Sequence, residues 1–114
     1  MNKKIKAKWV AALRSGQYKQ TQNQLRDGNK FCCLGVLCNI HAQEHPRIAK
    51  MQKNPKVYMG ETTVLPEAVI KWSGLKDDCG GQVIYRGLGE ALTELNDNEE
   101  LSFKKIAKLI EAQL

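Results

Sequence analysis

The sequence has little that would direct the chain into a membrane or out of a cell. No apolar run approaches the roughly 20 residues that a membrane-spanning helix requires. The start of the chain, MNKKIKAKWVAALRSG, is basic but lacks the apolar core and cleavage site of a secretory signal. Repeats and long Gly/Ser/Pro tracts are also absent. We therefore expect a soluble, cytoplasmic protein whose cysteines stay reduced.

Catalytic motifs are equally scarce. The sequence contains no Gly-x-Ser-x-Gly elbow, no P-loop and no dinucleotide-binding fingerprint. Its only histidines are His41 and His45, and the adjacent acids Asp77 and Asp78 are typical of solvated turns. An enzyme that uses a cysteine or a bound metal is therefore only the third hypothesis. No catalytic residue and no cofactor is predicted.

What the sequence does have is enough apolar residues for one core and an uneven charge. Apolar residues make up 42% of the 114, which predicts one globular domain over residues 1–114. The net charge is +6; residues 1–60 carry twelve Lys or Arg against two acids, and residues 61–100 carry three against nine. A basic face suits an anionic partner such as nucleic acid or a nucleotide phosphate. Scattered lysines also serve simply to solvate a surface.

Hydrophobic spacing and capping residues predict an α+β fold, with four or five short helices packed on a small antiparallel sheet or hairpin. Ile5, Trp9 and Leu13 recur at helical spacing, and Ser102 is a favourable N-cap. Asp27-Gly28 predicts a type I′ hairpin turn. The predicted elements are helices near 3–15, 33–45, 66–74, 88–95 and 102–114, a hairpin pairing 20–26 with 29–33, strands at 57–64 and 82–85, and a basic connector at 46–56.

Three of the four cysteines fall within KFCCLGVLCNIH, residues 30–41. Cysteine is among the most buried residue types, so Cys32, Cys33 and Cys38 are predicted to be structural thiols at a hairpin–helix junction. A helical wheel of the following helix gives two faces. The core face holds Cys33, Val36, Leu37, Ile40 and His41, and the opposite face holds Gly35, Asn39 and Gln43.

Two chemical alternatives for this segment stay open. Cys38, His41 and His45 share one helical face and, with Cys79, would make a tetrahedral metal site, although no Cys-x-x-Cys pair is present. Alternatively, a thiol at the start of the helix would have a lowered pKa. The histidines would then lie roughly 12 Å or more from that thiol, too far to act as its base.

A second group of polar residues flanks the predicted hairpin. Arginine offers phosphate a planar fork of donors, lysine a point charge and tyrosine a stacking surface. The alternative is an edge strand that charge protects from aggregation. The predicted ligand-binding residues are Arg14, Tyr18, Lys19, Arg26 and Lys30.

Four stretches carry a resemblance to a known family. In chain order they are ALRSGQYKQ, LRDGNKFCCLGVLCNI, LPEAVIKWSGL and LTELND with LSFKKIAKLIE. Together they resemble a family of small hypothetical proteins of bacteriophages and bacteria. The chain departs from that family where a Gly-rich stretch often precedes LR, here TQNQ, and where Asp often follows the third cysteine, here Asn39.

The resemblance implies a phage context, and it supplies no catalytic residue to carry over. Small phage proteins of this kind often counter host defence by masking a host protein or by sequestering a nucleotide signal. We therefore expect a non-enzymatic binding protein in the bacterial cytoplasm, whose partner is a host protein or an anionic nucleotide-like ligand. A nucleic-acid-binding accessory protein is the second hypothesis. The oligomeric state stays open.

Overall fold

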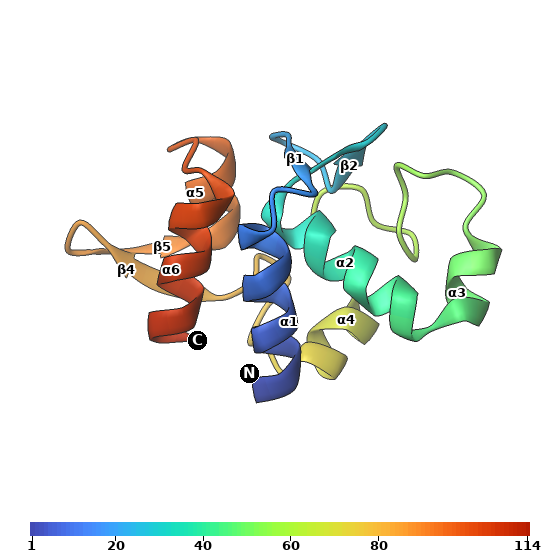
Figure 1. Cartoon of the computed structure of the whole chain (residues 1–114), viewed down its shortest axis with the longest axis horizontal. Helices are drawn as coiled ribbons and strands as arrows, with labels where there is room; N and C mark the ends of the chain where they lie inside the picture. Colours follow the sequence, from blue (N-terminus) through green and yellow to red (C-terminus); the bar gives the residue numbers. More distant parts are fainter.

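The computed structural model describes all of residues 1–114 and has an α+β fold, as predicted (Figure 1). The helices are α1 (Lys3–Arg14), α2 (Cys33–Glu44), α3 (Pro46–Met51), α4 (Glu67–Ser73), α5 (Leu92–Asp97) and α6 (Phe103–Gln113). The strands are β1 (Lys19–Gln20), β2 (Arg26–Asp27), β3 (Lys30–Phe31), β4 (Gln82–Tyr85) and β5 (Leu88–Ala91). They form a three-stranded sheet of order β1-β3-β2 and a β4-β5 hairpin. None of the helices has the length and apolar character needed to cross a bilayer.

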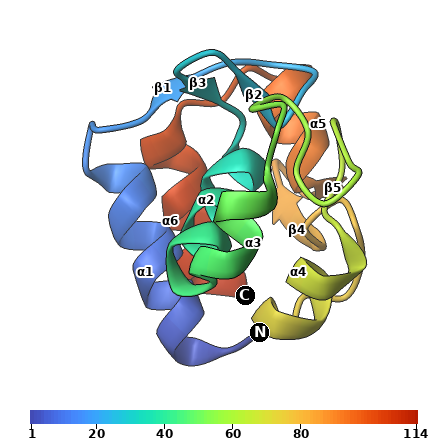
Figure 2. The same ribbon diagram turned by 90° about the vertical axis from the view of Figure 1, so that its right-hand side faces the viewer.

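Helix α2 is the centre of the core. Figure 2 shows α1 on one side of α2 and the β1–β3 strands over its N-terminal end. The helical wheel puts Gly35 on the face opposite the core, but in the structure Gly35 is buried. A Cβ built on it would lie 1.8 Å from the carbonyl oxygen of Leu25. The loop that carries Leu25 packs on this side of the helix, so only glycine fits there.

Capping residues set the helix ends, as the sequence predicted for Ser102 and Gly74 but not for Asn2. The side chain of Asn2 accepts the N–H groups of Lys4 and Ile5 at the start of α1. Ser102 accepts the N–H of Lys105 in the same way at the start of α6. Gly74 ends α4 in the left-handed region, at φ 75°.

The first hairpin is shorter than predicted and has a different turn. Its two-residue loop is Gly28-Asn29, and only Gly28 has positive φ, at 62°. That pattern fits a type II′ turn rather than type I′. At Leu25 the pairing continues on one side only: the Leu25 carbonyl accepts the Cys32 N–H at 3.2 Å, but the Leu25 N–H donates to the carbonyl of Thr62. Strand β1 pairs with β3 in parallel, which the sequence reading did not foresee.

Three other predicted segments differ in the structure. Residues 57–64 contain only an isolated bridge, because Met59 and Gly60 take positive φ and turn the chain. The connector at 46–56 contains α3, which has Pro46 in its first turn. Residues 88–95 begin as β5 and become helical only at Leu92.

Asn96 in α5 is fully buried and joins three parts of the fold. Its Oδ1 accepts the Cys33 N–H at the start of α2 and the side-chain amide of Gln20 in β1, at 3.2 and 2.8 Å. Its Nδ2 donates to the Thr21 carbonyl at 2.9 Å and to the carboxylate of Asp97. This one carboxamide therefore fixes β1 and α5 against the first turn of α2.

Candidate functional site

Cys32 and Cys33 lie where β3 meets α2, as predicted, whereas Cys38 lies in the middle of α2; all three are buried. Cys32 is the N-cap of α2, and its Sγ accepts the Gly35 N–H at 3.4 Å. Burial raises the pKa of the Cys32 thiol to about 11 and also raises the pKa of Cys33 and Cys38. The lowered pKa expected of a thiol at a helix start is therefore wrong. The cost of desolvating the thiolate outweighs the helix dipole.

The alternative metal set does not come together. The Nδ1 of His41 lies 2.6 Å from the Tyr58 hydroxyl, and the Nδ1 of His45 lies 2.7 Å from the carbonyl oxygen of His41. The two imidazole rings stack on each other at 4.0 Å rather than converging with Cys38 on one point. Cys79 lies instead in the turn after α4, beside two aspartates.

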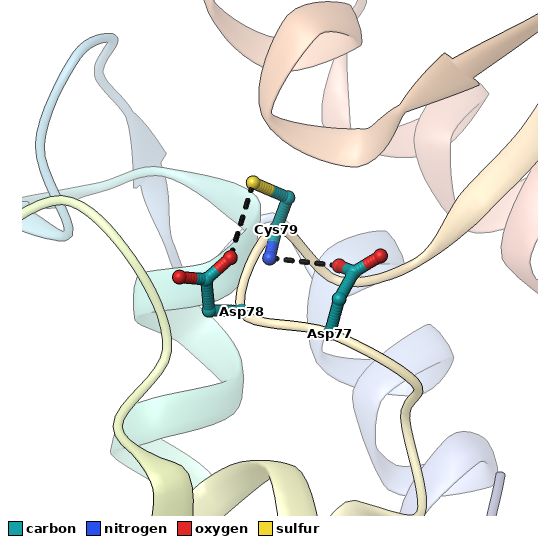
Figure 3. Close-up of side chains that lie close together, drawn as sticks. All are labelled: Asp77, Asp78 and Cys79. Carbon is teal, nitrogen blue, oxygen red and sulfur yellow. Dashed lines mark hydrogen bonds between the residues drawn. The ribbon is translucent and has the colours of Figure 1, made fainter.

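That turn is the one place where three side chains with metal-ligating atoms lie within 4.8 Å of one another, Asp77, Asp78 and Cys79. Figure 3 shows the two carboxylates on opposite sides of the turn. The Asp77 carboxylate accepts the N–H groups of Cys79 and Gly81, both at 2.9 Å. The Cys79 Sγ lies 3.4 Å from a carboxylate oxygen of Asp78. These contacts close a turn, as exposed aspartates commonly do.

The strand register divides the predicted cationic group between the two faces of the small sheet. Arg26 lies opposite Phe31, whereas Lys30 lies between Lys19 and Asp27. Because neighbouring residues of a strand point to opposite faces, Arg26 shares a face with Phe31, and the two lysines share the other. The guanidinium carbon of Arg26 lies 4.9 Å from the centre of the Phe31 ring. The sheet thus separates Arg26 from Lys19 and Lys30.

The other two predicted residues have partners within the fold. Arg14 forms a two-bond ion pair with Glu111 of α6, at 2.9 and 3.2 Å. This contact raises the pKa of Arg14 and lowers the pKa of Glu111. The Tyr18 hydroxyl accepts a hydrogen bond from Asn39 at 2.7 Å. Arg14 therefore belongs to the α1–α6 contact, and Tyr18 holds the side chain of Asn39 in α2.

A pocket of about 170 Å³ lies on the Arg26 face, and we call it the α2 pocket. One face of α2 forms its floor, and the β2–β3 hairpin forms one wall. Helix α3 and the loop after it form the other wall. The lining residues are Gly35, Cys38, Asn39 and Ala42 of the floor, Leu25, Arg26 and Phe31 of the hairpin wall, and Ala49, Gln52, Pro55, Lys56 and Tyr58 of the opposite wall.

Two cations and no carboxylate are among the residues that line the α2 pocket. The Nε of Arg26 donates to the Gly28 carbonyl at 2.7 Å, which leaves both Nη groups without a protein acceptor. Lys56 Nζ lies 3.7 Å from Asp27, a long contact between two half-exposed side chains. The pocket therefore pairs an apolar interior with positive charge at its rim, an arrangement suited to an anion that carries a ring.

The tyrosine of the pocket wall contacts a cluster of aromatic rings in which His41 is buried and Trp72 is half-buried. Burial raises the pKa of Tyr58 to about 12, so its hydroxyl stays protonated. Burial, reinforced by the neighbouring His45, lowers the pKa of His41 to about 4. The Trp72 ring meets His41 edge-on at 4.9 Å. A neutral imidazole thus holds the Tyr58 hydroxyl in place at neutral pH.

Sequence reasoning missed four polar residues of the pocket, Asn39, Gln52, Lys56 and Tyr58. The helical wheel puts Asn39 on the face opposite the core, and the sequence predicts that Lys56 belongs to a basic connector. The spacing of Gly35, Cys38, Asn39 and Ala42 at i, i+3, i+4 and i+7 was a usable signal, because it places four small or polar side chains on one helical face. Nothing local indicated that residues 52–58 would lie opposite that face.

The fold and the pocket define this molecule as a small α+β protein with a pocket that carries two cations in its lining. The chain belongs to the family described as "Domain of unknown function (DUF8296)", whose model matches residues 1–114. No curated protein and no solved structure matches the chain.

Proposed function

We propose that the protein is a non-enzymatic binding protein of bacteriophage type, which acts in the cytoplasm of a bacterial host and sequesters an anionic, nucleotide-like ligand in the α2 pocket. The observation that carries this proposal is the composition of the pocket, which has two cations and no acid around an apolar interior. The phage setting rests on the resemblance of the sequence to small phage proteins, for which counter-defence by sequestration is a common role.

The size of the pocket limits how such a ligand would lie. Its volume of about 170 Å³ is smaller than the ~300–1,000 Å³ of pockets that enclose a drug-sized molecule. One ring would therefore enter between α2 and the loop, where the side chains of Asn39 and Gln52 offer hydrogen bonds to its edge. The phosphate would stay at the rim, within reach of Arg26 and Lys56. Arginine suits this position because its Nη groups bind phosphate in a bidentate manner.

Calorimetric titration with ADP, adenosine and inorganic phosphate tests the assignment. We expect ADP to bind more tightly than either fragment, because it alone occupies both the interior and the rim. Arg26→Gln should weaken ADP binding by about tenfold or more, since each charge-assisted hydrogen bond contributes roughly 1.5–3 kcal/mol. Lys30→Gln is the matched control on the opposite face of the same hairpin, and it should leave binding unchanged.

Two results would count against this function. Equal losses in the Arg26 and Lys30 variants would point to general electrostatics rather than to the pocket. If ADP and adenosine both fail to bind, native mass spectrometry of the protein isolated from bacterial cells decides whether the pocket holds a different phosphorylated compound. A retained phosphorylated compound that is lost in Arg26→Gln would uphold the pocket, and a protein free of such a compound would overturn it.

The outer face of the small sheet favours nucleic acid as a second candidate ligand. Lys19 and Lys30 are direct neighbours in the β1–β3 register, and such a pair of like charges gains from a phosphate between them. Binding of a DNA duplex would then fall steeply with added salt, because phosphate contacts release counterions. Lys30→Gln would weaken this binding and Arg26→Gln would not, the reverse of the expectation for ADP.

A further inference from the structure

Positive charge is concentrated on two helices that pack side by side, α1 and α6 (Figure 1). Their sequences, KKIKAKWVAALR and FKKIAKLIEAQ, hold eight Lys or Arg against one acid, Glu111, a net charge of +7. The whole chain carries only +6, so the rest of the protein is close to neutral. The fold thus joins the two ends of the sequence into one basic surface.

A groove runs along the outside of this helix pair. It is lined by three cations, three small or apolar residues and one acid, namely Lys3, Lys6, Arg14, Ala7, Val10, Ala11 and Glu111. On α6, Lys104 and Lys108 lie seven and three residues before Glu111, so they share its side of the helix. We call this surface, defined by Lys3, Lys6, Lys104 and Lys108 around the groove, the α1–α6 face.

None of the four lysines that define the α1–α6 face forms an ion pair within the protein. Glu111, the one acid beside them, is already paired with Arg14. Lys3 and Lys6 are three residues apart and Lys104 and Lys108 are four apart, so each pair brings two like charges together on one helix and destabilises it. An anion bound between the members of each pair reverses this repulsion.

The side chains that the face lacks narrow the class of anionic partner. The core of a protein interface is rich in aromatic residues and depleted in lysine, and a helix that binds a membrane surface inserts large apolar side chains. Every exposed large apolar residue of this protein lies outside α1 and α6. Both comparisons therefore disfavour a protein or a membrane and leave nucleic acid.

The form of the nucleic acid follows in the same way. The aromatic residues of the two helices, Trp9 and Phe103, are buried, so they are not available to stack on the bases of a single strand. The groove is lined by no hydroxyl or amide side chain that would bind the 2′-OH of an RNA duplex. Closely spaced lysines alone suit the phosphates of a DNA duplex.

We propose that the α1–α6 face binds the phosphate backbone of duplex DNA without reading its sequence. Lysine contacts phosphate as a point charge, and such contacts carry no information about the bases. Ala7 and Ala11 are exposed and small, so the backbone can approach α1 closely between the lysines. The face shares no residue with the lining of the α2 pocket, so DNA and the pocket ligand bind independently.

Fluorescence anisotropy with a labelled DNA duplex tests the face. We expect a dissociation constant on the order of 1–100 µM at physiological salt, the range of sequence-independent binding. Lys104→Gln combined with Lys108→Gln should weaken binding about fivefold or more at low salt, and should reduce the slope of log K against log salt by about two, because two phosphate contacts are lost. Lys3→Gln combined with Lys6→Gln should do the same. A duplex that fails to bind at about 50 mM salt, or double variants that bind like the parent, would overturn the proposal.

Two control variants remove the same amount of charge elsewhere. Lys50→Gln with Lys53→Gln changes exposed lysines of α3 and the loop after it, and Lys19→Gln with Lys30→Gln changes the outer face of the small sheet. Both controls should bind the duplex nearly as well as the parent. A control that loses as much affinity as the α1 or α6 variant would refute this face, since net charge or the sheet would then be responsible. Circular dichroism checks that all variants are folded.

Four other polyanions test the class of partner. A single DNA strand of the same length, an RNA duplex, poly-glutamate and vesicles that contain phosphatidylserine should none of them bind more tightly than the DNA duplex. Tighter binding of any one would overturn the assignment to duplex DNA. The variant with Lys104→Gln and Lys108→Gln should also bind ADP as the parent does, so failure of the DNA face and failure of the α2 pocket are told apart.

Discussion

Asn96 is the residue whose replacement gives the sharpest test of how this fold is held together. Replacement by leucine keeps the volume similar and removes all four hydrogen bonds of the carboxamide. Gln20 would still donate to the Leu101 carbonyl, and Asp97 would still accept from Asn23. The Cys33 N–H and the Thr21 carbonyl would lose their side-chain partner.

The expected loss follows from these two orphaned groups. Each unsatisfied buried polar group costs about 1–3 kcal/mol, so Asn96→Leu should lower the free energy of unfolding by about 2–6 kcal/mol. Small domains have only about 5–15 kcal/mol in total. Urea denaturation followed by tryptophan fluorescence in a Trp72→Phe background measures the loss, because the remaining Trp9 indole donates to the Cys33 carbonyl at 2.9 Å. Asn98→Ala, at the exposed end of the same helix, should change stability by less than about 0.5 kcal/mol.

A second substitution at the same site separates hydrogen bonding from packing. Asn96→Asp preserves shape but places a buried carboxylate beside Asp97 and removes the donor to the Thr21 carbonyl. This variant should be strongly destabilised at pH 7 and partly recover as the pH is lowered, because protonation removes the buried charge. If Asn96→Leu costs less than about 1 kcal/mol, or if Asn96→Asp shows no recovery in acid, then this carboxamide does not organise the junction.

Three further predictions follow from particular contacts. Gly35→Ala should prevent or severely weaken folding, because its Cβ would lie 1.8 Å from the Leu25 carbonyl oxygen; an unchanged melting temperature would contradict this. Since the pKa of His41 falls to about 4 from its ordinary 6.5, the unfolded chain binds more protons between these values. Stability should therefore drop by about 1–2 kcal/mol from pH 7 to pH 4.5, and His41→Phe should flatten that dependence in urea titrations. In native thiol titration with a disulfide reagent, Cys79 should react first; rapid reaction of the three buried cysteines would refute their placement in the core.

The predicted helix ends at Gly74 and Ser102 are confirmed, because the interactions that end a helix involve only neighbouring residues. Ser102 satisfies an N–H group three residues away, and Gly74 needs only its own freedom to adopt positive φ. The β4 strand and the helix predicted at 102–114 followed in the same way from the spacing of apolar residues. The strand predicted at 57–64 is wrong although its residues favour strands, because Met59 and Gly60 take positive φ and turn the chain back on itself.

Long-range packing decided the features on which the candidate site depends. The Leu25 N–H donates to the carbonyl of Thr62 rather than to the hairpin, and β1 pairs with β3 in parallel. Neither contact can be predicted from the local sequence pattern, because each joins residues of two separate segments of the chain. The same packing brings the loop at 52–58 across from α2 to complete the pocket, and Arg26 reaches that pocket while Lys30 does not, since their side chains leave the sheet on opposite faces.

The sequence by itself therefore determined the α+β class, the ends of the capped helices and the clustering of the cysteines in an apolar segment, because each follows from contacts within a few residues. Only the tertiary structure decided the thiol pKa direction, the Asn96 junction and the α2 pocket. Burial and the meeting of distant segments create these three features, and both are properties of the packed chain rather than of any stretch of its sequence.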